Sequence, residues 1–305
     1  MQLDGLLDEA PMPAAAVSVF GRERMLYSGV AGAGRDDWWD LASLTKVLVT
    51  LPEALARLEL DVPLRELWPR AANAPVGGCT VRQMLCHSTG LPDTVQFFRT
   101  CRGRDDIVEA ALALPLSPSP EPIYSDIGYL LLGQLLTEVT GSSLAALALA
   151  RTGLRFGPIT DAPAVPTELC QWRGRLIVGE VHDENAWAMG GVSGHAGGFG
   201  TLDLVTSAAR AVLDQPQELQ ATNAAGERFA LGWWLAPTRG LGGPNPGPHG
   251  FGHAGFVGNR VWLEPDYGYG LVILSNRVHP TRHADRAPFI AWCDNLLQTV
   301  AGELR

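Results

Sequence analysis

The sequence predicts an α+β protein in which one antiparallel sheet, flanked by helices, is built from both ends of the chain and a mostly helical region is inserted between them. Strand-like apolar runs lie near both ends of the chain, at residues 14–20, 25–31, 229–235, 259–264 and 269–275. From about residue 60 to residue 215 the apolar spacing is mostly helical. We therefore expect a discontinuous sheet domain (1–60 with 216–305), a helical domain (61–215) and a functional site between the two.

The N-terminal elements are predicted to be a hairpin followed by a helix. Residues 21–24, Gly-Arg-Glu-Arg, separate the first two apolar runs and have the composition of a turn. From Ser43 onward the apolar residues follow helical spacing, at Leu44, Val47, Leu48, Leu51, Leu55 and Leu58. Pro52 falls inside this pattern, so we expect the helix to kink or restart there.

The rest of the chain alternates helices with loops rich in proline or glycine. Helical spacing recurs at residues 81–86, 107–114, 127–139, 144–154, 204–213 and 288–304. The proline-rich loop 115–122 is expected to be stiff, and the glycine- and proline-rich loop 237–250 to be mobile. Residues 265–268, Pro-Asp-Tyr-Gly, form a predicted turn between the last two strands.

Charge and cysteine content narrow the class of protein. The 305 residues carry a formal net charge of −9 without a basic stripe, which argues against nucleic acid or an anionic membrane as a partner. The N-terminus has early acidic residues where a leader would be basic, and no apolar run is long enough to span a bilayer, so we expect a cytoplasmic protein. The five cysteines form no Cys-x-x-Cys pair, which indicates free thiols in a reducing compartment.

Lys46 is the only lysine among the 23 basic residues, and it stands three positions after Ser43. Arginine would supply the same charge, but its guanidinium cannot be deprotonated in a protein, whereas a lysine can be when its surroundings lower its pKa. Residues i and i+3 share one face of a helix, so Ser43 and Lys46 can meet. The pair suggests a serine nucleophile beside an amine.

A serine nucleophile also needs a proton acceptor and a site for an oxyanion. Tyr124 precedes the next strong helical pattern, and its phenol could relay protons between Ser43 and Lys46. Near the C-terminus, Gly255 lies in the segment 251–256, where a glycine lets a substrate lie against the backbone.

Three segments together resemble the motifs of the penicillin-recognising serine hydrolases, which include class C β-lactamases, D,D-carboxypeptidases and their esterase relatives. They are Ser43-Leu44-Thr45-Lys46, Tyr124-Ser125-Asp126 and His253-Ala254-Gly255. Further segments resemble a β-lactamase-like subgroup of this family, at residues 84–92, 181–186, 191–197 and 276–280. The resemblance covers roughly residues 14–300 and implies the β-lactamase/transpeptidase-like fold.

The resemblance also implies a role for each matching residue. Ser43 would be the nucleophile, and Lys46 and Tyr124 would form the coupled base, with either of the two as the final proton acceptor. Asp126, His253, Gly255 and Phe256 would contact the substrate, and the backbone amides of Ser43 and Phe256 would form the oxyanion hole. No cofactor or metal is needed for this chemistry.

Two departures from the family pattern bear on the substrate. The third motif usually begins with lysine, and His253 at that position would offer a weaker, pH-dependent cation to a substrate carboxylate. The second motif usually ends in asparagine, and an ionised Asp126 can accept hydrogen bonds but cannot donate them. We expect Asp126 to hold Lys46 in its charged form, which favours Tyr124 as the base and weakens the case for efficient penicillin turnover.

Other interpretations of the sequence are less well supported. The segment 191–195, Gly-Val-Ser-Gly-His, lacks the final glycine of a nucleophile elbow, which argues against Ser193 as the nucleophile. His182, Asp183, Glu184 and His195 include metal-ligating types, but their spacing is not that of a metal site, and hydrogen bonding is expected instead. Cys86 and His87 are neighbours on a predicted helix and so face different directions.

We therefore expect a β-lactamase-like serine hydrolase that cleaves a small ester, amide or lactam through an acyl-enzyme on Ser43. The alternatives are a true class C-like β-lactamase or D,D-carboxypeptidase, which a cytoplasmic address would separate from peptidoglycan, and a catalytically idle ligand-binding or assembly module. The partner implied is a small-molecule substrate. The sequence carries no indication of oligomeric state.

Overall fold

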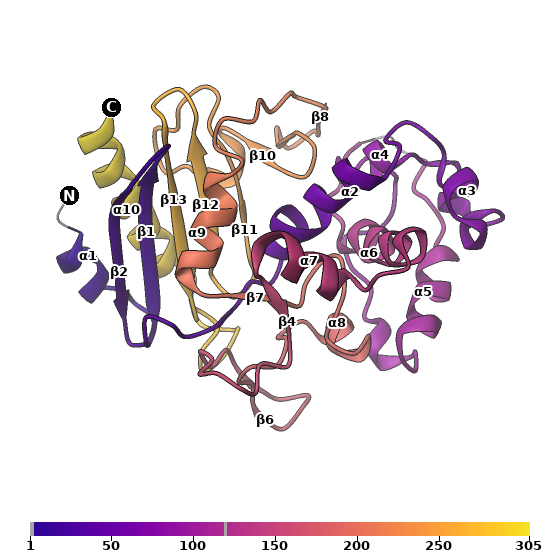
Figure 1. Cartoon of the computed structure of the whole chain (residues 1–305), viewed down its shortest axis with the longest axis horizontal. Helices are drawn as coiled ribbons and strands as arrows, with labels where there is room; N and C mark the ends of the chain where they lie inside the picture. Colours follow the sequence, from indigo (N-terminus) through magenta and orange to yellow (C-terminus); the bar gives the residue numbers. More distant parts are fainter. Residues whose placement is uncertain (1–2, 119–120) are drawn as a thin grey trace.

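A computed structural model describes residues 3–118 and 121–305, and its centre is an eight-stranded antiparallel sheet (Figure 1). The strand order is β2-β1-β13-β12-β11-β10-β9-β8, so the N-terminal hairpin pairs directly with the last strand of the chain. The strands are β1 (Ala15–Gly21), β2 (Met25–Ala31), β8 (Ala221–Thr222), β9 (Arg228–Phe229), β10 (Trp234–Leu235), β11 (Phe251–Ala254), β12 (Arg260–Glu264) and β13 (Tyr269–Ser275). The predicted sheet built from both chain ends is confirmed.

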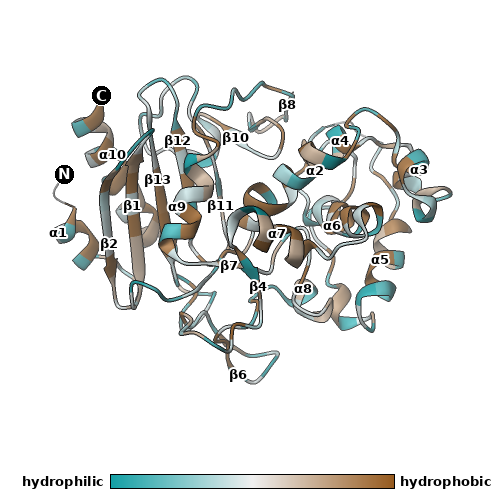
Figure 2. Cartoon of the chain, viewed as in Figure 1, coloured by the Kyte–Doolittle hydropathy of each residue, from teal (hydrophilic) through white to brown (hydrophobic). Residues whose placement is uncertain are grey.

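The central strands are apolar on both faces because a helix covers each face. In β1, Val17 and Val19 pack with α10 (Ala287–Leu304), whereas Ala16 and Phe20 belong to the core on the opposite side. This alternation follows from the two-residue period of a strand. On that opposite side lies α9 (Leu202–Arg210), and in Figure 2 the central strands β1 and β13 are coloured largely as hydrophobic.

Most of the remaining helices form the second half of the molecule around the buried helix α6 (Asp126–Thr140) (Figure 1). Ser125 caps the N-terminus of α6 by accepting a hydrogen bond from the Gly128 amide, and Gly141 ends the helix in the left-handed conformation. The other helices of this half are α2 (Leu51–Arg57), α3 (Leu64–Leu67), α4 (Val81–Leu85), α5 (Arg104–Leu112), α7 (Leu144–Thr152) and α8 (Glu184–Ala188), whereas α1 (Asp4–Asp8) packs beside β2 on the sheet half.

Short strands connect the two halves. A three-stranded sheet joins β3 (Trp39–Asp40), β7 (Gly198–Gly200) and β4 (Arg155–Phe156), with β7 in the middle. A separate pair is formed by β5 (Leu169–Cys170) and β6 (Arg175–Leu176). The chain therefore enters the helical half directly after β3, which places the residues following Asp40 at the junction.

The structure corrects some of the predicted boundaries. α9 falls within the segment assigned to the helical domain, yet it packs on β1 and β13 of the large sheet. Residues 229–235 do not form one strand, because Gly232 turns the chain with a φ of 78° between β9 and β10. Part of the loop 115–122 lies outside the described residues.

The structure bears on two predictions made above, that the cysteines are free thiols and that no segment is long and apolar enough to span a bilayer. All five cysteines are free thiols, as the sequence predicts. Within residues 3–118 and 121–305, no single helix is long and apolar enough to cross a membrane, and only the bent pair α6 and α7 passes on length and composition.

Candidate active site

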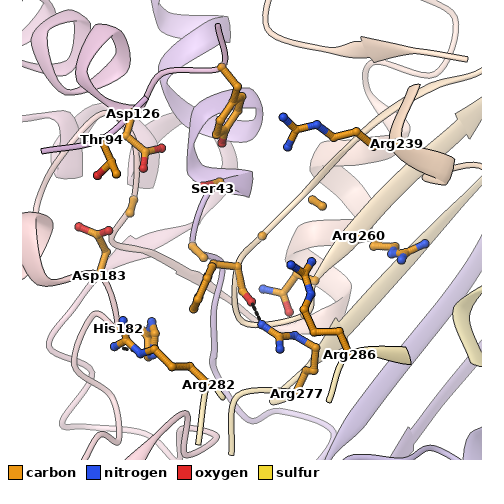
Figure 3. Close-up of a pocket in the computed structure, with 18 of the residues that line it drawn as sticks. Ser43, Thr94, Asp126, His182, Asp183, Arg239, Arg260, Arg277, Arg282 and Arg286 are labelled. Carbon is orange, nitrogen blue, oxygen red and sulfur yellow. Dashed lines mark hydrogen bonds between the residues drawn. The ribbon is translucent and has the colours of Figure 1, made fainter. Parts of the chain in front are cut away.

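A cavity of about 630 Å³ lies where the two halves meet, and it contains most of the residues that the motifs single out. Ser43 and Asp126 line it from the helical half, and Gly255 and Phe256 line it from the loop after β11. Figure 3 shows Ser43 near the centre of the cavity, with Asp126, Thr94 and Asp183 on one side and a group of arginines on the other.

Ser43 lies at the end of a tight turn that leaves β3. Ala42, just before it, has a φ of 45°, a conformation that is strained for a residue with a Cβ atom. The buried Asp40 stabilises the turn, because its Oδ1 accepts from the Ala42 amide at 2.7 Å and its Oδ2 accepts from the His182 amide at 2.6 Å. Asn259 adds a 2.7 Å bond from Nδ2 to the Asp40 carbonyl. Local sequence patterns do not reveal these roles of Asp40 and Asn259, because their partners are distant in the chain.

Lys46 is fully buried, and its amine meets three oxygen atoms. Its Nζ lies 2.9 Å from Ser43 Oγ, 3.1 Å from the His195 carbonyl oxygen and 2.7 Å from Asp126 Oδ1. Burial lowers the pKa of Lys46, but Asp126 and Tyr124 together oppose burial and leave the pKa raised. The amine is therefore an ammonium at neutral pH, as expected from its pairing with Asp126.

The helix that carries Lys46 opens with a π-helical segment, Lys46–Thr50, and continues as α2. π-Helical turns are wide and often occur at functional sites. Pro52 lies in the first turn of α2, where a missing backbone N–H is tolerated. The predicted restart of the helix near Pro52 thus takes the form of a change in helix type.

Tyr124 lies over the Lys46 amine, with Nζ 5.1 Å from the centre of the ring. Burial raises the pKa of the phenol, and the opposing effects of the Lys46 charge and of hydrogen bonding with Lys46 and Ser43 do not overcome it. Tyr124 is therefore a neutral phenol at pH 7. The resting site holds a charged amine, a neutral phenol and the Ser43 hydroxyl.

His87 fixes the position of Tyr124 by bonding to both of its neighbours. The His87 carbonyl accepts from the Ile123 amide at 3.0 Å, and its Nδ1 accepts from the Ser125 amide at 3.0 Å. Its ring lies 4.7 Å from that of Tyr124, centre to centre. Burial, aided by the nearby Lys46 charge, lowers the pKa of His87 to about 3, so the imidazole stays neutral.

Cys86, which precedes His87 in the chain, is buried. Burial raises the pKa of the Cys86 thiol to about 12. A thiol with this pKa carries almost no thiolate at neutral pH, so it is a poor nucleophile. Cys86 is a packing residue.

The two amides expected to form the oxyanion hole are not used elsewhere in the fold. Within the described part of the chain, neither the Ser43 N–H nor the Phe256 N–H has a hydrogen-bond acceptor. Gly255 brings the Phe256 loop against the turn before Ser43, since a Cβ on Gly255 would lie 2.7 Å from the Leu41 carbonyl oxygen. Arg277 Nη2 donates to the Phe256 carbonyl at 2.7 Å and holds the loop.

The expectation that His253 presents a cation to the substrate is wrong. Its side chain is completely buried in β11, and burial, followed by the charge of Lys46, lowers its pKa well below 6.5. The ring is stacked on Trp234 with centres 4.4 Å apart, and Trp234 lines the cavity while His253 does not. His253 is thus a buried neutral ring, packed on Trp234 and with its centre 5.9 Å from that of the Tyr124 ring.

Ser193 and His195 belong to a hydrogen-bond network that holds the Lys46 site. Ser193 Oγ lies 2.8 Å from His195 Nδ1, and His195 Nε2 lies 2.9 Å from Asp183 Oδ1. Ser193 is buried and does not line the cavity, which excludes the elbow interpretation in this conformation. The network fixes the loop whose His195 carbonyl accepts from Lys46.

The metal interpretation is not supported by the geometry. His182 Nε2 lies 2.9 Å from Glu168 Oε2, and Arg282 pairs with both Glu168 and Glu184, so an arginine cation already occupies the centre of this group. In residues 3–118 and 121–305 no group of three or more His, Cys, Asp or Glu side chains is arranged to hold a metal ion.

The chain matches one protein family by sequence and shares its fold with several solved structures. The Beta-lactamase family model matches residues 3–292. The N-acetylmuramyl-L-alanine amidase of Bacillus subtilis (strain 168) is 26% identical over 307 residues, covering 79% of this chain and 68% of the relative. A class C beta lactamase from Rhodobacter sphaeroides has the same fold with a TM-score of 0.73, 18% identity and coverage of 98% and 97% of the two chains. The octameric penicillin-binding protein homologue from Pyrococcus abyssi superposes with a TM-score of 0.74, 15% identity and coverage of 98% and 76%.

Proposed function

Because the chain belongs to the Beta-lactamase family, we propose that it is a serine hydrolase that cleaves a small ester, amide or lactam through an acyl-enzyme on Ser43. The observation that carries this proposal is the 2.9 Å contact between Ser43 Oγ and the buried Lys46 amine. A completely buried lysine is costly unless its charge is paired and used. The contact places that charge beside a hydroxyl that faces the cavity.

In the proposed mechanism Lys46 stays charged and Tyr124 moves the proton. An ammonium cannot accept a proton, but its charge favours loss of the Tyr124 phenol proton to solvent as the pH rises, and it stabilises the phenolate that results. The phenolate takes the Ser43 proton as Ser43 Oγ bonds to the substrate carbonyl carbon, and the oxyanion is received by the Ser43 and Phe256 amides. The tetrahedral intermediate then breaks its bond to the leaving group, which receives the proton from Tyr124. A water molecule then attacks the acyl carbonyl carbon by the same steps, with Tyr124 taking its proton. The ester bond to Ser43 breaks, and Tyr124 returns the proton to Ser43 Oγ.

Esters and amides fit this site better than penicillins do. Asp126 is committed to the Lys46 ammonium and, when ionised, has no N–H to donate to a substrate amide carbonyl. His253 is neutral and stacked on Trp234, so the third motif lacks the lysine cation that the family usually offers to the carboxylate of a β-lactam or a D-alanyl peptide. These two features favour esterase or amidase activity over the class C-like and D,D-carboxypeptidase alternatives. The intact Ser43, Lys46 and Tyr124 group argues against an idle binding module.

A covalent probe tests the nucleophile directly. A fluorophosphonate should label Ser43, as located by peptide mass spectrometry, and Ser43→Ala should abolish both labelling and hydrolysis of p-nitrophenyl acetate. Ser193→Ala is the matched variant, because it removes the other serine considered as a nucleophile, and its label should remain on Ser43. Labelling that persists in Ser43→Ala and disappears in Ser193→Ala would overturn the assignment.

Substrate preference needs a separate comparison. We expect faster turnover of p-nitrophenyl esters than of a chromogenic cephalosporin at equal enzyme concentration. The reverse order would move the assignment to the class C-like alternative. Hydrolysis of neither, together with absent labelling, would favour the idle module.

A further inference from the structure

We propose that the sheet side of the cavity binds a dianionic group of the substrate through Arg260, Arg277 and Arg286. The inference rests on the proposed function, since the group is taken to belong to the molecule whose bond Ser43 cleaves. None of the three arginines belongs to the motifs that identify the catalytic residues. Below, these three side chains are called the arginine recess.

The recess brings together residues from three separate elements. Arg260 begins β12, Arg277 follows β13, and Arg286 is the N-cap residue of α10. All three line the cavity that contains Ser43. Figure 3 shows them on the side opposite Asp126 and Asp183. A substrate held at Ser43 can therefore extend one end toward the recess.

Two of these guanidinium groups are buried without a counter-charge. Arg260 is 7% exposed and Arg277 is 6% exposed. Among the residues that the structure describes, none of the three forms an ion pair with a carboxylate, and Arg260 and Arg277 each leave Nη1 without an acceptor. By contrast, the cavity residue Arg282 pairs with both Glu168 and Glu184. Buried charges are normally paired, so an anion from outside is the missing partner.

Local charge indicates how much negative charge the ligand carries. Asp294 also lines the cavity beside the first turns of α10 but forms no ion pair with the described arginines. Three guanidinium groups against this one carboxylate leave two positive charges in the recess. Burial and the neighbouring Arg286 lower the pKa of Arg277, which reflects like charges held close together. A dianion would balance the recess, whereas one carboxylate would leave it positive.

The arginines are also held in place before any ligand arrives. Arg277 is fixed by its bond to the Phe256 carbonyl and lies 5.6 Å from the centre of the Phe256 ring. The Arg260 guanidinium lies 5.4 Å from the centre of the Phe289 ring. Phe289 and Ile290, in the first turn of α10, line the same cavity, so the positive end of that 18-residue helix adds to the field. Groups fixed in advance lose little entropy on binding.

The overall negative charge of the protein distinguishes the arginine recess from the rest of the surface as a place for an anion. The chain carries a net charge of −9, which repels anions from most of its surface. Guanidinium groups bind phosphoryl and carboxylate oxygens with paired hydrogen bonds. The substrate class is therefore an ester or amide bearing either a phosphomonoester or two carboxylates. A phosphomonoester and a pair of carboxylates both supply the two negative charges and the oxygen acceptors that the arginine recess requires.

Binding to a catalytically silent protein tests the recess independently of hydrolysis. In Ser43→Ala, calorimetry at low ionic strength would compare inorganic phosphate, glutarate and acetate as probes. We expect phosphate or glutarate to bind at least about tenfold more tightly than acetate, because the dianion pairs with more guanidinium groups. Stronger binding of phosphate identifies a phosphoryl source, and stronger binding of glutarate identifies a dicarboxylate source.

Variants of the recess then locate the site. Arg260→Gln and Arg286→Gln should each weaken binding of the preferred dianion by roughly tenfold or more, since each removes charge-assisted hydrogen bonds. Arg286 is exposed, so its variant remains informative if Arg260→Gln fails to fold. Arg99→Gln is the matched control, because Arg99 is an exposed arginine that lines the same cavity from the helical half. The affinity of the Arg99→Gln variant for the preferred dianion should match that of the parent protein.

The outcomes separate this inference from the proposed function. Equal binding of acetate and the dianions, no binding of any probe, or equal losses in the Arg99, Arg260 and Arg286 variants would overturn the recess. Dianion binding that depends on Arg260 and Arg286 would support it even in a protein whose Ser43 takes no fluorophosphonate label. In that case the serine hydrolase proposal would fail and the anion site would stand.

Discussion

At the scale of single residues, the charge state of Lys46 depends on which neighbours reach it. Burial alone would lower the pKa of Lys46, but Asp126 at 2.7 Å and Tyr124 nearby reverse the direction of the pKa shift. The same carboxylate raises the pKa of Tyr124. One aspartate in place of the asparagine usual in the family thus affects both possible bases.

Lys46→Arg tests whether position 46 requires an amine or only a positive charge. The three oxygens around Nζ surround a point-like ammonium in a fully buried site, and a planar guanidinium cannot occupy that space. We expect kcat for p-nitrophenyl acetate to fall by roughly 10²–10⁴-fold. Circular dichroism should confirm a folded variant. Activity near that of the parent would show that charge alone suffices.

Asp126→Asn should move the pH dependence of catalysis toward lower pH. Removing the carboxylate takes away a negative charge that raises the pKa of both Lys46 and Tyr124, so the phenolate forms at lower pH. The alkaline rise of kcat/KM, measured on p-nitrophenyl acetate, should shift accordingly, and turnover of a chromogenic cephalosporin should increase because the amide can donate. Asp294→Asn, in the same cavity, is the control. An unshifted profile in Asp126→Asn would contradict this account of the base.

At the scale of elements, the site depends on a close approach between α6 and the loop that carries Ser193 and His195. Gly133 in α6 faces Gly194, and a Cβ on Gly133 would lie 2.5 Å from the Gly194 amide nitrogen. The Gly194 carbonyl accepts from Thr50 Oγ1, and the next carbonyl, that of His195, accepts from Lys46. Two glycines far apart in sequence therefore set the position of the His195 carbonyl, which accepts a hydrogen bond from Lys46.

Gly133→Ala should destabilise the protein even though alanine is the better helix former. The added methyl group meets backbone atoms of the loop, which cannot rotate away, and overpacking of this kind costs about 1–3 kcal/mol. Gly302→Ala in α10 is the matched substitution, because a Cβ there meets nothing within 4 Å. It should be neutral or stabilising by up to ~1 kcal/mol. Urea unfolding of both variants measures the difference, and equal stabilities would contradict the close packing.

At the scale of the whole molecule, the sheet and the helical half bury neutral histidines at their junction. His87 holds the Tyr124 segment, and His253 lies in β11 against Trp234. Both have pKa values lowered by burial, to about 3 for His87 and well below 6.5 for His253. The junction therefore favours the neutral imidazole, whereas the unfolded chain binds the proton near pH 6.5.

Stability should fall as the pH decreases from 6.5 to 4.5. In this window the unfolded state binds protons that the folded state excludes, and each histidine lowers the free energy of unfolding by about 1.4 kcal/mol per pH unit. Urea unfolding across the window measures the slope. Glu168 and Asp183 stay ionised in the folded state across this window because their pKa values are lowered, and their unfolded-state pKa values lie at or below its lower end.

His87→Gln should make the dependence of the unfolding free energy on pH shallower, because one fewer proton is taken up on unfolding. The exposed His249 provides the control, and His249→Gln should keep the slope of the parent, since its side chain is 76% exposed. A parent protein whose stability does not change between pH 6.5 and 4.5 would contradict the neutral buried state of both histidines.

Local patterns explain which predictions were confirmed. The apolar spacing of α6 and α10 and the short runs of β1 and β13 identify these elements because each pattern depends on residues close in the chain. The one-turn spacing of Ser43 and Lys46 likewise requires only a helix, and the structure brings the two side chains together at 2.9 Å. The β9–β10 turn was missed because Gly232, inside an apolar run, is a weak indication of a turn.

The sequence by itself determined the fold class, the main elements and the group that contains Ser43, Lys46 and Tyr124. The tertiary structure decided the charge of the site, because burial and pairing depend on residues that meet only in the folded chain. It removed His253 from the cavity, paired Lys46 with Asp126, and left Arg260 and Arg277 buried without carboxylate partners among the described residues. Periodicity identifies elements, but only their packing sets the local dielectric and the distances that fix a pKa.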